Sequence, residues 1–340
     1  MERNEVLERL APYEAIRPRD LTTTAKVVVA ETPSGFAIRP TRGAQLIDIG
    51  EAGLPALYKR TGLSQALAKN VAAETVASVA TEALLSGGEH SLLLDENGVV
   101  DIADVGKFRH LPAERVLGNI ERGMGETEYS RVLTLPNQTV QLETMGVEET
   151  PVVAGDLMRA GVTVRFSTTG LSMPVVASSA MRLICTNGMT STENLREFSY
   201  AGGGDSNGNG NAAIWDWLRR SVRDAYRAVA PLIERFREMQ NTPVSAEERV
   251  QMVAALIRNA RLPKDAADAV LARALEQPPE TVWDVFNLGT WATSHAVPDS
   301  NGQAVVRAQR ALSVFAHEDA HDRMCPTCRR GGPAHNHSDE

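Results

Sequence analysis

The stretch that divides this chain reads Ala201-Gly-Gly-Gly-Asp-Ser-Asn-Gly-Asn-Gly-Asn211. Its glycines and asparagines favour turns, and it carries almost no apolar surface to bury. Before it, short β-branched runs alternate with helical segments, whereas after it every apolar pattern has helical spacing. We therefore predict an α+β fold, in which a mostly antiparallel sheet with flanking helices precedes an all-helical C-terminal part and a short Cys/His tail. The expected units are residues 1–200, the loop 201–212, the helical part 213–322 and the tail 323–340.

The N-terminal part carries two hairpin signals. Asn97-Gly98 stands between the apolar runs 91–94 and 99–102, and this dipeptide favours the tight turn of a two-residue hairpin. A second hairpin is expected around Pro33. Helical spacing, which includes Leu46 and Ile47, predicts packed helices between residues 43 and 85. A further helix is expected near 113–122, and strands are expected at 129–135, 139–145, 162–167 and 174–184.

Beyond the dividing stretch the sequence predicts five helices. The first follows residue 213 and is expected to kink at Pro231. The second begins at Ser245, and Glu248 three residues later completes the pattern of a capping box. The others are predicted from Pro263, from Pro279 to His295 and over residues 303–322.

The composition is that of a globular protein. Of the 340 residues, 43% are hydrophobic and 23% are charged, which is enough to form a core without disulfides or metals. No apolar run approaches the ~18 residues that would span a bilayer, and the start of the chain lacks the layout of a secretory signal. We therefore expect a cytoplasmic protein without membrane contact. The net charge of −8 gives no global attraction to nucleic acid, so any such site must be local.

One candidate site lies at the end of a predicted strand. Cys185, Thr186 and Asn187 would present a thiol, a hydroxyl and an amide close together, with Arg182 just before them. These groups could serve catalysis, although no histidine in a nucleophile-type motif accompanies them. The structural alternative is a buried Cys185, a turn at Asn187-Gly188 and an ion pair at Arg182.

Oxygen ligands around the dividing stretch follow the spacing of a calcium-binding loop. Asp205, Asn207 and Asn209 occupy its first, third and fifth positions, and Asp216 stands where such loops usually have a bidentate Glu. Ala212 occupies a position that normally holds a branched apolar residue, and no helix is predicted before the loop. A flexible joint is therefore preferred over a calcium site.

The tail concentrates histidine and cysteine. His317 and His321 fit the His-Glu-x-x-His pattern of zinc peptidases. Cys325 and Cys328 follow directly, and a closed set of four nitrogen and sulfur ligands leaves no position for a catalytic water. The tail thus predicts either a structural zinc knuckle or an unliganded polar segment. The zinc ligands would come from His317, His321, Cys325, Cys328, His335 and His337.

The first helix after the dividing stretch carries a row of arginines opposite its apolar residues. The row consists of Arg219, Arg220, Arg223 and Arg227. Nucleic-acid phosphates are suitable partners for such a row, and Trp215, Trp217 and Tyr226 are nearby candidates for stacking on bases. A solvated helix face is the alternative.

Three stretches together resemble a phage/plasmid-like protein family of unknown function. Residues 181–189, Met-Arg-Leu-Ile-Cys-Thr-Asn-Gly-Met, are similar to the family's Arg-Leu-Val-Cys-Thr-Asn-Gly signature, and residues 162–170 are similar to the strand before it. Residues 94–101 resemble the family's hairpin without its arginines, and residues 281–295 resemble its late helix. The resemblance implies a setting in mobile-element biology and assigns no reaction.

Three functions follow as hypotheses. The resemblance and the arginine row favour a DNA-metabolism protein of a mobile element, which binds single-stranded DNA or assists recombination. An enzyme centred on Arg182, Cys185 and Asn187 is one alternative, and a scaffolding protein that forms homo-oligomers is another. No motif in the sequence decides between catalysis and binding.

Overall fold

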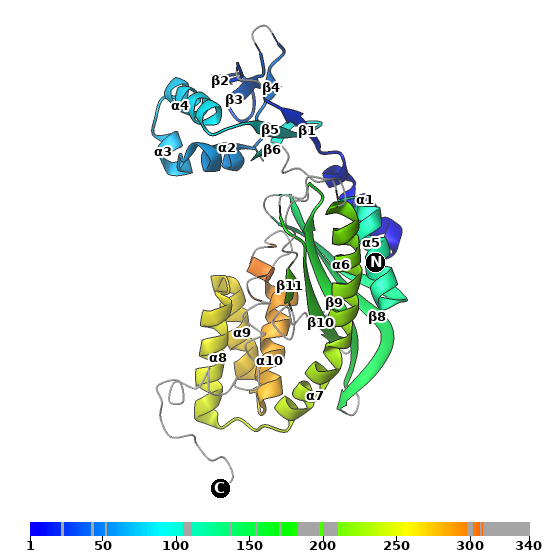
Figure 1. The fold of residues 1–340 in the computed structure, drawn as a ribbon. Helices are drawn as coiled ribbons and strands as arrows, with labels where there is room; N and C mark the ends of the chain where they lie inside the picture. Colours follow the sequence, from blue (N-terminus) through cyan, green and yellow to red (C-terminus); the bar gives the residue numbers. More distant parts are fainter. Residues whose placement is uncertain are drawn as a thin grey trace.

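The computed structural model describes residues 1–21, 24–41, 44–51, 53–104, 111–135, 138–153, 156–169, 172–182, 197–199, 210–297, 302, 304–306 and 308. Figure 1 shows a small N-terminal lobe joined to a larger body that contains a curved sheet and most of the helices. The predicted fold class is confirmed, since antiparallel sheets with helices precede a helical C-terminal part. No helix within these ranges is long and apolar enough to cross a membrane.

Residues 17–104 form the small lobe, whose described strands make two antiparallel sheets in the orders β1-β5-β6 and β2-β3-β4. The strands are β1 (Arg17–Asp20), β2 (Lys26–Val29), β3 (Phe36–Arg39), β4 (Ile47–Asp48), β5 (His90–Asp95) and β6 (Gly98–Asp104). The helices are α2 (Leu54–Thr61), α3 (Gln65–Lys69) and α4 (Ala73–Ser86). Apolar side chains from both sheets, α2 and α4 share one core.

Both predicted hairpins are confirmed in this lobe. In the turn between β5 and β6, the Asn97 backbone N–H donates to Asp95 Oδ1 at 2.7 Å. Gly98 has a φ of +132°, a conformation that side chains disfavour. The helical prediction at Ile47 is wrong, because this residue pairs with Ile38 of β3. Strand pairing satisfies the backbone there and outweighs the local helical spacing.

The body is built on a sheet of order β11-β10-β9-β8-β7, and every pairing among its described strands is antiparallel. The strands are β7 (Thr127–Leu135), β8 (Thr139–Val153), β9 (Asp156–Ser167), β10 (Val175–Arg182) and β11 (Glu197–Ser199). β8 and β9 extend beyond the predicted 139–145 and 162–167. A register shift between Met145 and Glu149 interrupts the alternation on which the prediction relied.

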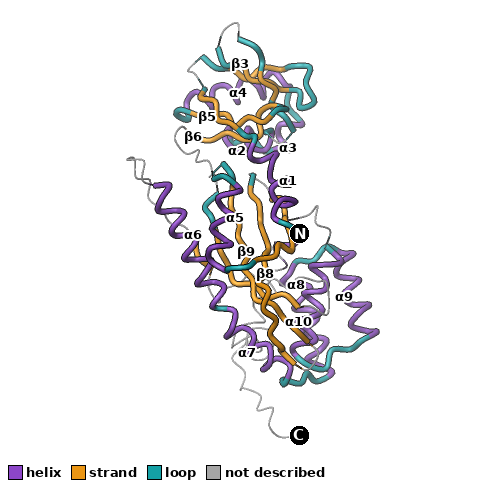
Figure 2. Tube along the Cα trace, turned by 90° about the vertical axis from the view of Figure 1, so that its right-hand side faces the viewer, coloured by secondary structure: helices purple, strands orange, loops and turns teal. Residues whose placement is uncertain are grey.

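One face of this sheet is apolar and packs against α1 (Arg3–Glu14), α5 (Ala113–Met124) and α6 (Gly210–Arg227). We call it the apolar face; it includes Val140, Leu142, Val162, Val164, Phe166 and Val176. Figure 2 shows α5 and α6 on one side of the sheet and the later helices of the C-terminal part, those between residues 246 and 291, on the other.

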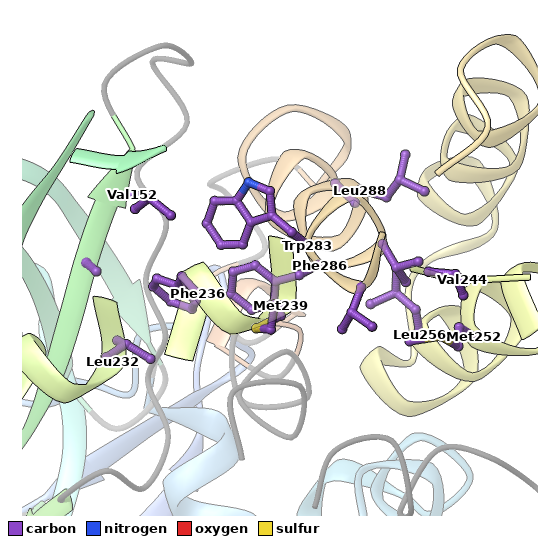
Figure 3. Close-up of a cluster of buried hydrophobic side chains, with 14 of the residues drawn as sticks. Val152, Leu232, Phe236, Met239, Val244, Met252, Leu256, Trp283, Phe286 and Leu288 are labelled. Atoms are coloured by element: carbon purple, nitrogen blue, oxygen red, sulfur yellow. The ribbon is translucent and has the colours of Figure 1, made fainter. Parts of the chain in front are cut away.

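The C-terminal part continues with α7 (Val229–Gln240), α8 (Ala246–Ala260), α9 (Lys264–Glu276) and α10 (Val282–Trp291), which runs into a π-helical turn at Ala292–Ala296. Its core centres on Phe236, Trp283 and Phe286, whose ring centroids lie 5.0, 5.2 and 5.6 Å apart (Figure 3). Met158 and Ala180 of the sheet belong to the same core, so α7 attaches the helical part to one end of the apolar face.

The predicted helix start at Ser245 is confirmed. Ser245 Oγ accepts a hydrogen bond from the Glu248 backbone N–H at 3.3 Å, which forms the expected capping box. The expected kink at Pro231 takes the form of a break: α6 ends at Arg227, whose carbonyl Pro231 cannot bond because it has no N–H, and Pro231 then lies in the first turn of α7. Of the predicted helix 303–322, the described residues 304–306 and 308 are helical.

Candidate nucleic-acid interface and buried polar face

The predicted arginine row lies on the outer surface of α6. Ile214, Leu218 and Val222 are buried against the sheet and α5, and the helical repeat turns the arginines outward. The side chains of Arg219, Arg220 and Arg223 are 50, 60 and 49% exposed, and Arg227 is exposed as well.

Helix α5 runs beside α6 and adds two arginines that are distant in sequence. The guanidinium of Arg115 lies 4.7 Å from the centre of the Trp215 ring. A Cβ at Gly123 would come within 3.1 Å of the Arg219 carbonyl oxygen, so the two backbones are nearly in contact there. The exposed Arg122 is therefore close to Arg219. We call the surface formed by Arg115, Arg122, Arg219, Arg220, Arg223 and Arg227 the arginine face.

Acidic residues offset part of this charge. Asp216 pairs with Arg219 at 2.7 Å and with Arg220 at 3.1 Å, and Asp224 lies 3.7 Å from Arg223. Together α5 and α6 contain six arginines and four acidic residues. Ion pairs between exposed side chains contribute only about 0–1 kcal/mol each. They can therefore be exchanged for phosphate contacts at little cost, and the arginine face keeps an excess of positive charge within an acidic chain.

Of the aromatic residues of α6, Trp217 is half-buried, and Trp215 and Tyr226 are less available to a base than the sequence suggested. Trp215 is 7% exposed and lies beneath Arg115, so it offers no open face to a base. Tyr226 is half-buried and points its hydroxyl toward Gly146. Burial, with a smaller contribution from Glu148, raises the pKa of Tyr226. The expectation that Trp215 stacks on bases is therefore wrong, and the arginine face is suited to phosphates.

The second face of the five-stranded sheet is polar, yet many of its side chains are buried. We call it the polar face. Its buried polar residues are Thr139, Gln141 and Glu143 of β8, Thr163 and Ser167 of β9, and Ser179 of β10. At the edge formed by β7, Leu133 packs with Ala266, Val297, Val305 and Val306. The buried polar groups of this face need hydrogen-bond partners, because their transfer from water into the protein interior costs free energy.

Charged and amide groups meet at the centre of the polar face. Gln141 Nε2 donates to Glu143 Oε1 at 3.1 Å, and both side chains are 1% exposed. Arg165 occupies the position opposite Gln141, and Arg131 occupies the position opposite Glu143. In the part of the chain that the structure describes, Thr163 Oγ1 is buried and has no hydrogen-bond partner. This cluster could not be predicted from the sequence, because alternating polar residues usually mark a solvated face.

The other predicted sites fall largely outside the described residues. The backbone of Arg182 pairs with Met158 at the end of β10, whereas Cys185, Thr186 and Asn187 lie beyond that range. Asp216 is the described member of the calcium set, and both of its oxygens contact arginines. The remaining calcium and zinc candidates are not among the described residues, which contain no group of His, Cys, Asp and Glu that could hold a metal ion.

Comparisons of the chain with protein-family models, with curated proteins and with solved structures give no match. The resemblance to the phage/plasmid-like family therefore stays a prediction.

Proposed function

We propose that this chain is a DNA-metabolism protein of a mobile element, and that it binds the backbone of single-stranded DNA along the arginine face. The observation that supports the proposal is the gathering of six exposed arginines on two adjacent helices. Arginine contacts the phosphate group through a planar fork of donors. Because Trp215 is buried, binding depends on phosphates and shows little preference among base sequences.

A salt series tests this proposal. Binding of a fluorescent oligothymidylate is measured by fluorescence anisotropy between about 50 and 300 mM salt. Affinity that comes from phosphate contacts falls steeply over this range. Four arginine–phosphate contacts would give a slope of about −3 for log K against log salt, since each contact on a single strand contributes about −0.7. Affinity that does not depend on salt, or the absence of binding at low salt, contradicts the proposal.

A matched pair of double variants locates the surface. Replacing Arg223 and Arg227 with Gln removes two charges from the arginine face and should reduce the slope by about 1.4. Replacing Arg258 of α8 and Lys264 of α9 with Gln removes the same charge from the other side of the sheet (Figure 2) and should leave the slope unchanged. Equal losses in the two variants would assign binding to net charge and not to the arginine face.

A second candidate is an enzyme, which the buried cluster at Gln141, Glu143 and Thr163 favours. Active sites commonly retain buried polar groups at a cost in stability. Its other proposed residues are Arg182, Cys185, Thr186 and Asn187. Cys185→Ala should keep the native unfolding midpoint but abolish complementation of a deletion strain. Loss of soluble protein would instead assign Cys185 to packing.

A third candidate is a scaffolding protein that forms homo-oligomers. Light scattering on the purified chain tests this candidate.

A further inference from the structure

The small lobe contains a cavity that the proposed function does not use. It has a volume of about 220 Å³ and lies between β2, β3, α4 and the turn that leads into β5. Its walls are mostly aliphatic and include Leu21, Val27, Ile38, Leu84 and Leu85. An apolar cavity of about 150 Å³ is large enough for benzene. This one therefore has room for one ring or two fused rings.

His90 brings the main buried polar group to this cavity. It is the first residue of β5 and is 4% exposed. Its Nδ1 lies 3.5 Å from Asp104 Oδ1, but among the described residues this nitrogen has no hydrogen-bond partner. Asp104 is held by Arg60, which donates through Nη1 at 2.7 Å, and Arg60 Nε donates to the Ile102 carbonyl oxygen. A fixed carboxylate therefore stands beside one nitrogen of the imidazole.

The imidazole of His90 belongs to the wall of the cavity. His90 lines the cavity and Asp104 does not, and Nδ1 is the nitrogen that lies toward Asp104. A Cβ at Gly87 would lie 3.1 Å from Nε2, and the absence of that carbon leaves room for the ring. A carboxylate beside Nδ1 favours the tautomer that carries its proton there. In that tautomer Nε2 is an acceptor and can receive a hydrogen bond from a ligand.

The remaining polar groups around the cavity are already engaged or lie at its rim. The Thr81 hydroxyl accepts from the Val27 N–H at 2.9 Å and donates to the Ala77 carbonyl oxygen at 2.8 Å. Lys26 and Glu89 are exposed, so their charges stay in water. Among the described side chains that line the cavity, a ligand would therefore meet mostly aliphatic groups, and the His90 imidazole is the buried one left to accept a hydrogen bond.

We propose that this cavity binds a small neutral aromatic molecule that carries one hydrogen-bond donor, such as a phenol hydroxyl or an aromatic N–H. The ring fills the aliphatic space, and the donor pairs with His90 Nε2. Asp104 acts as a positioning residue, since it orients the imidazole without touching the ligand. The site belongs to a different lobe from the arginine face, so this proposal does not depend on DNA binding.

The test uses two probes that differ by a single hydroxyl, 4-fluorophenol and fluorobenzene, titrated into the full chain and followed by ¹⁹F NMR. The native protein should bind both probes saturably and should prefer the phenol by about tenfold, as expected for one hydrogen bond to a buried acceptor. Absence of saturable binding of either probe overturns the proposal. Equal affinity for the two probes also overturns it, because His90 would then make no contribution.

Variants assign the preference to His90. His90→Leu should retain binding but lose the tenfold preference for the phenol, and His295→Leu, at an exposed histidine of the body, should change neither. If His90→Leu does not fold, Asp104→Asn gives the decision, because it keeps the cavity and removes the charge that orients the imidazole. An unchanged preference in Asp104→Asn with a folded spectrum would contradict the proposed role of the Asp104–His90 pair.

Discussion

The two faces of the five-stranded sheet are made from the same strands but bury different kinds of side chain. On the apolar face, Leu142, Val164 and Val176 occupy neighbouring strands and pack against the helices. One residue along, the polar face buries Gln141, Glu143 and Thr163. Apolar packing stabilises a sheet directly, whereas a buried polar row must recover its desolvation cost through hydrogen bonds. We infer that the apolar face holds the fold together and that the polar face is retained for another purpose.

The largest expected effect is at the centre of the apolar face. Phe166 is 1% exposed and contacts the core shared by α1, α5 and α6. Phe166→Ala should lower the free energy of unfolding by about 3–5 kcal/mol, because a large cavity replaces the ring. The urea midpoint at constant m-value measures the change. Phe166→Leu is the control and should cost about 1.5 kcal/mol or less. Similar losses in both variants would show that the ring volume is not what matters.

The stability of the polar face should depend on its hydrogen bonds. Gln141→Leu places an apolar side chain at a position that is 1% exposed, and on an ordinary buried face it would be stabilising. Here it removes a donor to the Glu143 carboxylate, so we expect a loss of about 1.5–3 kcal/mol. Gln251→Leu is the matched control, because Gln251 makes the same type of bond to Glu247 on the surface of α8.

The control Gln251→Leu should change the free energy of unfolding by no more than about 0.5 kcal/mol, since the hydrogen bond between Gln251 and Glu247 is exposed to solvent. If Gln141→Leu is neutral or stabilising in the same urea measurement, the hydrogen bond to Glu143 is not required. The two faces of the sheet would then be energetically alike.

This contrast also separates what the sequence could predict from what it could not. Alternation identified the cores of β8 and β9, and turn chemistry identified the hairpin at Asn97-Gly98. The helical repeat also predicted the exposure of Arg220 and Arg223 on α6. These features depend on neighbours within a few residues, and a single segment of sequence contains that information.

Features that depend on distant segments were not predictable in this way. Arg122 joins Arg219 because α5 and α6 approach closely at Gly123, almost a hundred residues away in sequence. The burial of Glu143 depends on the packing around a face whose pattern alone indicates solvent. His90 and Asp104 become neighbours through the register of β5 and β6. Here the tertiary structure decides the environment of each side chain.

The smallest expected effects concern two buried threonines in adjacent strands. They differ in whether the hydroxyl has a hydrogen-bond partner among the described residues. On the side of the apolar face, Thr144 Oγ1 donates to the Val162 carbonyl oxygen at 2.8 Å, whereas Thr163 Oγ1, on the polar face, has no hydrogen-bond partner among the described residues. Thr144→Val should therefore lose about 1 kcal/mol, and Thr163→Val should gain about 1 kcal/mol, because it removes a buried hydroxyl without a partner. The urea midpoint should therefore fall in Thr144→Val and rise in Thr163→Val, each compared with the native protein. A loss of stability in both variants would mean that the Thr163 hydroxyl is satisfied. The polar face would then be a fully bonded network that needs no ligand or reaction to explain it.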